Sequence, residues 1–145
     1  MVKISIKNLQ KKIPISPRRI KKAILKVLSL EGSGKSGQIS VCFMSDKSIR
    51  ELNYRYLGKG APTDVLAFEA GEKGGVFLAD LAVSSDTALR NAKIYQTSPL
   101  YELYLYVAHG VLHLLGYNDS TARQTKIMQR KAAAIINSLN FNLCP

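Results

Sequence analysis

The sequence predicts an α/β (or α+β) fold, with a single mixed sheet of about four strands covered by about five helices. Three observations lead to this prediction. Short segments alternate apolar and polar residues with the period of a strand, and longer segments between them have the apolar spacing of a helix. Capping residues, prolines and glycines mark most boundaries. The length, 145 residues, suits one domain spanning 1–145 with a substantial core.

The first half of the chain is expected to form two strands and two helices. Residues 2–7 alternate apolar and polar side chains, which is typical of a strand with one solvated face. Ser16-Pro17 should begin a helix that ends at Gly32, because proline is favoured at the first helical position. Residues 39–43 are the next predicted strand. Ser45 or Asp46 should cap the second helix, which ends near Gly58.

The second half should contain a hairpin followed by three helices. The strands 64–69 and 76–83 flank a turn that contains glycine. Ser84 or Ser85 should cap a helix that reaches about Tyr95. Ser98-Pro99 should begin another, ending at Leu115 with Gly116 just past it. Asp119 or Ser120 should cap the last helix, whose apolar stripe is Ile127, Met128, Ala132, Ile135, Ile136 and Leu139.

Charge is the strongest signal in the composition. The chain has 21 basic and 10 acidic residues, a net charge of +11. Before Glu31 there is no acidic residue, although the same stretch contains Lys3, Lys7, Lys11, Lys12, Arg18, Arg19, Lys21, Lys22 and Lys26. This pattern predicts a polyanionic partner, most often nucleic acid, and salt-sensitive binding. The alternative is that the charge serves only solubility.

The remaining bulk features exclude several classes of protein. No apolar run approaches the length that spans a bilayer, and the N-terminal segment lacks the apolar stretch of a signal peptide, so we expect a cytoplasmic protein without a membrane partner. Cys42 and Cys144 imply no disulfide, and neither has a Cys-x-x-Cys partner, so a thiolate zinc site is not expected.

The two histidines of the chain, His109 and His113, are four residues apart in an almost wholly apolar helical segment. Residues at i and i+4 share one helix face, so both imidazoles can approach one metal ion, with a third ligand from the chain beyond the turn. A single histidine there would most simply be a core residue, but two, followed by a turn and Asp119, favour a metal or catalytic site. The spacing is that of the zincin His-Glu-x-x-His, but Gly110 replaces the general base. A glycine there would leave room for substrate or neighbouring backbone.

Residues 109–117, His-Gly-Val-Leu-His-Leu-Leu-Gly-Tyr, resemble the signature H-G-x-L-H-L-x-G-Y-D-H of the YbeY-type endoribonucleases, bacterial factors for ribosomal RNA maturation and quality control. Residues 51–53 with 62–68 resemble the family block E-L-N followed by P-T-[DN]-V-L-S-F, and 79–84 resemble G-D-I-x-I-S. The resemblance covers roughly residues 45–119. It implies a single-strand-specific endoribonuclease that processes small-subunit rRNA ends. Ribosomal RNA and the ribosome or its small-subunit proteins would be its partners.

The resemblance also implies one Zn²⁺ per chain, held by three signature histidines. Two of these carry over to His109 and His113, and the third falls on Asp119, with Asn118 at the preceding aspartate. Aspartate is an accepted zinc ligand. The alternative is that Asp119 only caps the last helix, although Ser120 could do so instead. A metal ion other than zinc is a further alternative, because the type of ligand governs which metal a site prefers.

The family arginine after E-L-N falls on Leu57 in this chain, and Arg55 lies two residues earlier. Two residues on a helix are about 200° apart, so Arg55 can take the catalytic role only if the segment is unwound. Lys59 is an alternative phosphate contact, and both could be plain surface cations. Asp64 and Asp80 match family aspartates. Each could orient a histidine or anchor a loop, and the structural role is favoured.

The sequence therefore leaves three alternative functions open. The first is an endoribonuclease in which His109, His113 and Arg55 are catalytic, and in which the two histidines and Asp119 hold the metal. A metal-free version would use one histidine as base and the other as acid. The second is a non-catalytic ribosome-associated RNA-binding factor. The third is a metal hydrolase for a small molecule or peptide, which the charge and Gly110 disfavour.

Overall fold

The computed structural model describes residues 2–32, 34, 36–58, 63–73 and 76–141. Four strands and five helices follow in the order β1 (Val2–Asn8), α1 (Pro17–Glu31), β2 (Gly37–Met44), α2 (Asp46–Leu57), β3 (Val65–Lys73), β4 (Val76–Ser84), α3 (Ser85–Tyr95), α4 (Pro99–Leu114) and α5 (Ala122–Ser138). The predicted class is confirmed, and the predicted boundaries agree to within a few residues. None of the described helices has the length and apolarity that crossing a membrane requires.

The sheet is mixed, with strand order β1-β2-β4-β3. β1, β2 and β4 are parallel, and β3 pairs antiparallel with β4 as the second arm of the predicted hairpin. The register of β3 shifts between Glu69 and Gly71, where Gly71 has a φ of 92°. An irregularity of this kind bends an edge strand.

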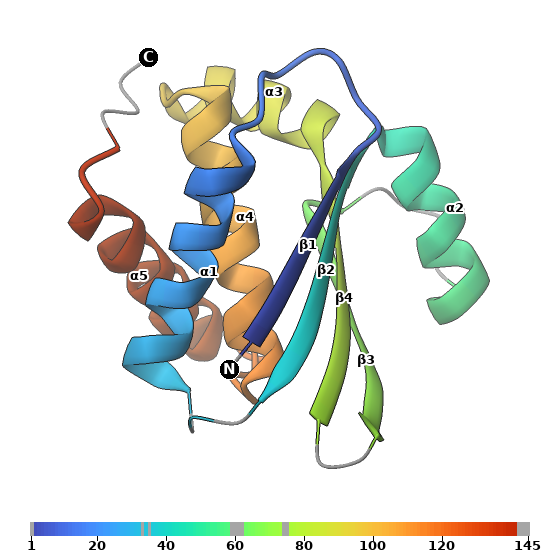
Figure 1. Cartoon of the computed structure of the whole chain (residues 1–145). Helices are drawn as coiled ribbons and strands as arrows, with labels where there is room; N and C mark the ends of the chain where they lie inside the picture. Colours follow the sequence, from blue (N-terminus) through green and yellow to red (C-terminus); the bar gives the residue numbers. More distant parts are fainter. Residues whose placement is uncertain (1, 33, 35, 59–62, 74–75, 142–145) are drawn as a thin grey trace.

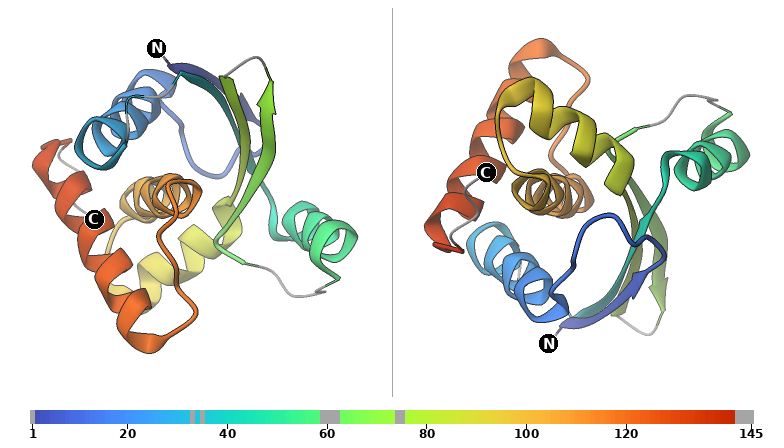
Figure 2. Two further views of the ribbon diagram at one scale, coloured as in Figure 1. Left: turned by 90° about the horizontal axis from the view of Figure 1, so that it is seen from below. Right: turned by 90° about the horizontal axis from the view of Figure 1, so that it is seen from above.

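The two faces of the sheet are covered unequally (Figures 1 and 2). α1, α3, α4 and α5 lie on one side, with α4 next to the sheet and α5 outside it, whereas α2 lies on the other side. Side chains of β2 and β4 that face α4 belong to the main core, among them Ile39, Val41, Phe43, Leu81 and Val83. On the opposite face, Met44, Leu66 and Ala82 form a smaller cluster with Ile49 of α2.

The helix starts follow the capping rules closely, with one correction. Ser16, Ser45, Ser84 and Ser98 each accept a hydrogen bond from the first turn of their helix. The predicted cap of α5 at Asp119 or Ser120 is wrong. Thr121 caps α5, since its hydroxyl accepts the Gln124 N–H at 3.1 Å while the Gln124 side chain accepts the Thr121 N–H at 3.2 Å. This reciprocal pair satisfies two free N–H groups, more than either predicted residue would.

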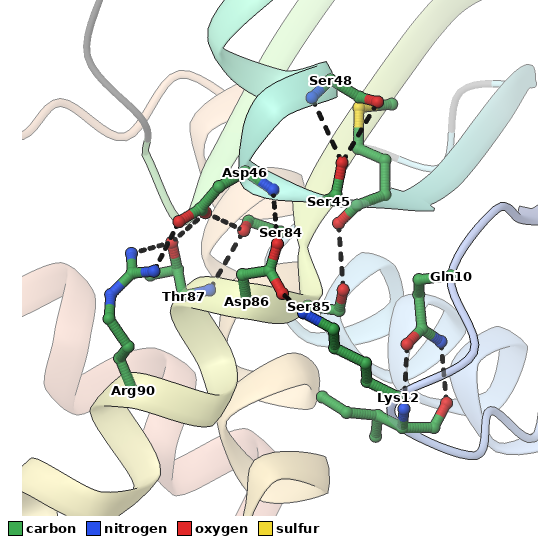
Figure 3. A network of polar contacts seen from close by, with 12 residues as sticks. Gln10, Lys12, Ser45, Asp46, Ser48, Ser84, Ser85, Asp86, Thr87 and Arg90 are labelled. Atoms are coloured by element: carbon green, nitrogen blue, oxygen red, sulfur yellow. Dashed lines mark hydrogen bonds and ion pairs between the residues drawn. The ribbon is translucent and has the colours of Figure 1, made fainter.

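A polar network joins the N-termini of α2 and α3 (Figure 3). One oxygen of Asp46 accepts hydrogen bonds from the hydroxyls of Ser84 at 2.6 Å and Thr87 at 2.9 Å, and the other pairs with Arg90. In return, Asp86 accepts the Asp46 N–H at 2.9 Å. Asp86 also pairs with Lys12, from the segment before α1, at 2.7 Å. Two helix starts on opposite sides of the sheet are thereby fixed to each other.

Candidate active site

α4 holds both histidines and is the most deeply placed helix of the molecule. Its side chains are buried nearly all round, including Leu103, Val107, Val111 and Leu112. The histidines lie in the last turns, where His109 is half-buried and His113 is exposed. Because apolar packing on several sides fixes the helix, it also fixes the direction in which both imidazoles leave the backbone.

Gly110, between the two histidines, lets α4 lie against the sheet. A Cβ at this position would stand 2.8 Å from Cδ2 of Leu81 and 3.0 Å from Cγ2 of Val65. The space was predicted to accommodate substrate or neighbouring backbone, and this is wrong: two side chains of β3 and β4 occupy it. Gly110 therefore sets the distance between the site and the sheet.

The turn after α4 has the geometry of a Schellman motif. Gly116 has a φ of 102°, its N–H donates to the carbonyl of His113 at 3.1 Å, and the N–H of Tyr117 donates to the carbonyl of Leu112 at 3.1 Å. A non-glycine residue would be strained at this φ. The motif reverses the chain and brings Asp119 back beside His109.

Tyr117 anchors this turn to two other helices through a set of contacts that the sequence did not reveal. Its hydroxyl donates to Oε2 of Glu31 at 2.6 Å, and Lys131 of α5 pairs with Oε1 of Glu31 at 2.9 Å while lying 5.4 Å from the Tyr117 ring centroid. The hydrogen bonds from Tyr117 and then Lys131 hold the pKa of Glu31 below its usual value. No local pattern connects residues that lie 86 and 100 positions apart in the chain.

His109 and Asp119 form the closest pair of the site. Nε2 of His109 lies 3.7 Å from Oδ2 of Asp119, with side chains 20% and 45% exposed. This distance is too long for a hydrogen bond. It is close to the roughly 3.4 Å that separates two ligand atoms bound about 2.1 Å from a tetrahedral zinc. Within the described part of the chain, neither side chain has a hydrogen-bond partner.

His113 lies one helical turn beyond His109 and on the same face. Among the described residues, no three His, Cys, Asp or Glu side chains come close enough together to hold a metal ion. Of the three predicted ligands, His109 and Asp119 therefore lie close together, and His113 is exposed on the same helix face as His109.

The predicted role of Arg55 depended on an unwound segment, and the segment is helical. α2 continues to Leu57, so Arg55 and Leu57 lie about 200° apart around its axis. Both are exposed, on a helix that covers the opposite side of the sheet from α4 (Figure 2). Lys59, the alternative phosphate contact, lies outside the described residues.

The two aspartates matched to the family differ in position. Oδ1 of Asp64 accepts the N–H of Val65 at 2.7 Å and the hydroxyl of Thr63 at 3.2 Å, which agrees with the loop-anchoring role. Asp80 precedes Leu81, which packs against Gly110, and successive strand residues point to opposite faces. Asp80 therefore points away from the histidines, toward a groove of about 670 Å³ between the sheet and α2. It cannot orient an imidazole of α4.

Comparisons with known proteins identify the family to which the chain is similar. The sequence model of the family described as Endoribonuclease YbeY matches residues 5–140. The chain is 38% identical to an Endoribonuclease YbeY of Syntrophus aciditrophicus, over 88% of this chain and 84% of that one. It is 35% identical to that of Pelotomaculum thermopropionicum, over 95% and 97%. The solution structure of TM1509 from Thermotoga maritima superposes with a TM-score of 0.63 at 25% identity, covering 98% and 93%.

Proposed function

This chain belongs to the Endoribonuclease YbeY family, and on that premise we propose that it cleaves phosphodiester bonds of single-stranded ribosomal RNA in the cytoplasm. Processing of small-subunit rRNA ends and ribosome quality control would be its cellular roles, with the ribosome or small-subunit proteins as partners. The observation that carries the proposal is the His109–Asp119 pair at 3.7 Å, next to His113 on the same helix face. The net charge of +11 supports a polyanionic substrate.

We propose further that His109, His113 and Asp119 hold one Zn²⁺. Three observations support the fit. The His109–Asp119 separation suits two ligands of one ion. Asp119 is not engaged as a helix cap, because Thr121 has that role. His113 is exposed, so its imidazole can change rotamer without disturbing the core. When bound, zinc would supply a Lewis acid for a phosphoryl oxygen or a more acidic bound water.

The side chains of the site have their own tasks in this proposal. The α4 backbone and the Schellman turn would direct the two imidazoles and the Asp119 carboxylate toward one ion at the surface. A phosphodiester can approach there because His113 and Asp119 are both exposed. Without a metal, one histidine would accept the ribose 2′-OH proton while the other protonates the leaving oxygen.

The second candidate is a non-catalytic RNA-binding factor of the ribosome. Leu57 at the position of the family arginine favours it, since a leucine cannot neutralise charge that develops on a phosphate. The same fold and positive charge would then serve binding alone.

Cleavage and metal content, measured together, test the proposal. Single-stranded RNA is incubated with wild type, His113→Ala and Asp119→Ala, and bound zinc is counted in each preparation. We expect one zinc per wild-type chain, zinc loss in both variants, and cleavage lower by roughly 100-fold or more in His113→Ala. The matched control is Tyr95→Phe, at an exposed residue of α3, which should retain zinc and activity.

Several outcomes would contradict parts of the proposal. Equal traces of cleavage by wild type and His113→Ala would indicate a contaminant and favour the binding factor. Cleavage that persists after exhaustive chelation would remove zinc as the catalyst. Unchanged zinc content in Asp119→Ala would remove that residue from the ligand set.

A further inference from the structure

We propose that the outward face of α5, continued by the neighbouring side of α1, is the surface that binds the RNA backbone where the strand leaves the site. This inference rests on the proposed function, because it takes the ligand of the site to be RNA.

The positive charge of the chain is concentrated on these two helices. α1 and α5 carry nine lysines and arginines against one carboxylate, a surplus of eight out of the net +11. The basic residues are Arg18, Arg19, Lys21, Lys22, Lys26, Arg123, Lys126, Arg130 and Lys131. The carboxylate is Glu31, which is already paired with Lys131 and Tyr117. α5 itself contains no acidic residue.

Three cations of α5 line up on its solvent side. With about 100° per residue, Arg123, Lys126 and Arg130 fall within about 60° of one another around the axis, opposite the buried stripe that includes Met128 and Ala132. All three are exposed, and none has an ion pair or hydrogen bond within the described ranges. From Arg123 to Arg130 the helix rises about 10 Å. Unpaired cations in a row are available to successive phosphates.

This row begins at the site and extends toward α1. Arg123 lies four residues after Asp119, so the two Cα atoms are at most about 14 Å apart. α1 lies beside α5 (Figures 1 and 2). Arg19 of α1 donates to the carbonyl of Phe141 just past α5 at 3.1 Å, and Lys22 lies 5.9 Å from the ring centroid of Phe141. The basic residues therefore lie on two neighbouring helices, of which α5 begins close to the turn that contains Asp119.

The chemistry of this surface selects phosphates and not bases. Its exposed side chains on α5 are cations, uncharged polar groups, two alanines and Ile127, with no aromatic ring for base stacking. We therefore expect the surface to bind the backbone of single strands independently of sequence and to add a strong salt dependence.

Two triple variants with the same change in charge test the proposal. The first is Arg123→Gln/Lys126→Gln/Arg130→Gln. The matched control is Lys3→Gln/Lys7→Gln/Lys47→Gln, which removes three exposed cations from β1 and α2. Binding of a labelled 20-nucleotide single-stranded RNA is measured by fluorescence anisotropy between 50 and 250 mM KCl. Glutamine keeps helix propensity close to that of lysine and arginine, and circular dichroism checks the fold of both variants.

We expect the α5 variant to lower the slope of log K against log [salt] by about 2 and to weaken binding roughly 10- to 100-fold at 100 mM salt, since each phosphate contact to a single strand contributes about 0.7 to the slope. The control should change the slope by well under 1. Equal slopes for the two variants, or a larger loss in the control, would overturn the proposal. The proposal would also be overturned if the α5 variant lost binding to anionic lipid vesicles while its RNA binding stayed unchanged.

A second measurement does not depend on the variants. Lysine acetylation of the wild type, followed by mass spectrometry, should show Lys126 protected by RNA and Lys47 unprotected. Absence of protection at Lys126 would count against the surface. Both assays measure binding, so they separate the two proposals. A changed slope in the α5 variant without any cleavage by the wild type would support the binding surface and contradict the nuclease activity. Intact cleavage with an unchanged slope would support the nuclease activity and contradict the binding surface.

Discussion

Two groups of carboxylates in this molecule differ in how completely their hydrogen bonds are satisfied. Asp46 and Asp86 receive hydrogen bonds from hydroxyls, a backbone N–H and two cations (Figure 3). The Asp119 side chain, in contrast, has only His109 at 3.7 Å among the described residues. Asp46 accepts three of these hydrogen bonds and Asp86 accepts two, so each carboxylate fixes elements of the fold to one another. The Asp119 carboxylate accepts no such hydrogen bond from the described residues and lies beside the His109 imidazole, so it is available to a metal ion or a substrate.

The pKa values of Asp46 and Asp86 are both lowered in the folded protein. Burial raises the pKa of Asp46, but the hydrogen bonds from Ser84, Arg90 and Thr87 together outweigh it and hold the pKa below its usual value. The pKa of Asp86 is lowered mainly by the hydrogen bond from Lys12 and then by the backbone N–H of Asp46. The network therefore contributes to stability, whereas the histidine site is expected to contribute to function.

The largest contrast should appear when each carboxylate is removed. Asp46→Ala leaves the buried hydroxyls of Ser84 and Thr87 without their acceptor, so we expect unfolding free energy to fall by roughly 2–4 kcal/mol. Asp119→Ala should change it by no more than about 0.5 kcal/mol, because no hydrogen bond is lost. Urea unfolding of the metal-free proteins measures both. A loss in Asp119→Ala that equals the loss in Asp46→Ala would erase the distinction.

Gly110→Ala should break the site through its packing. The added Cβ meets Leu81 at 2.8 Å. Overpacking costs about 1–3 kcal/mol, and the better helix propensity of alanine returns up to about 1 kcal/mol. We expect a net loss of roughly 1–2 kcal/mol by urea unfolding, together with weaker zinc binding as α4 moves from the sheet.

The matched test is a double-mutant cycle with Leu81→Val, which removes the atoms nearest the new Cβ. The double variant should be more stable than the sum of the two single effects predicts. Strict additivity would show that Leu81 does not limit the approach of α4.

Stability should depend on pH through the network of Asp46 and Asp86. Because the folded-state pKa values of Asp46 and Asp86 are lowered, their contribution is fully present above the unfolded value of about 4 and is lost as pH falls through the folded values. Urea unfolding from pH 2.5 to 6 should show this loss in the wild type. The variant Asp46→Asn/Asp86→Asn should be less stable at pH 6 and should lose less stability below pH 4. An unchanged acid dependence in the double variant would place its origin in other carboxylates.

The smallest expected effect concerns the contact between Tyr117 and Glu31. Tyr117→Phe keeps the ring but removes the hydroxyl that donates to Glu31 at 2.6 Å, so we expect a loss of about 1 kcal/mol or less. Amide hydrogen exchange should quicken in the turn 115–121, because one anchor of that turn is gone. Tyr95→Phe, at a tyrosine 65% exposed on α3, should change neither quantity. Unchanged exchange in Tyr117→Phe would show that the Schellman motif alone holds the turn.

The sequence by itself determined the fold class, the strand and helix order, and the helix that carries His109 and His113. These follow from local rules, because side-chain period, capping and the i, i+4 relation act within a few residues. The cap of α5 was missed although its signal is local, since the Thr121–Gln124 pair competes with Asp119 and Ser120 for the same role. The family motif also placed the third site residue at Asp119, which the turn brings beside His109.

Only the tertiary structure decided the surroundings of the site. The side chains that fill the space at Gly110, the face to which Asp80 points, and the contact of Tyr117 with Glu31 and Lys131 all depend on packing between elements far apart in the chain. The three cations of α5 can be read in the sequence, but the position of α5 beside α1 and its lack of ion pairs at these residues within the described ranges cannot. Residue periodicity fixes which side of an element is buried, whereas the partner it is buried against is set by how the helices and the sheet pack together.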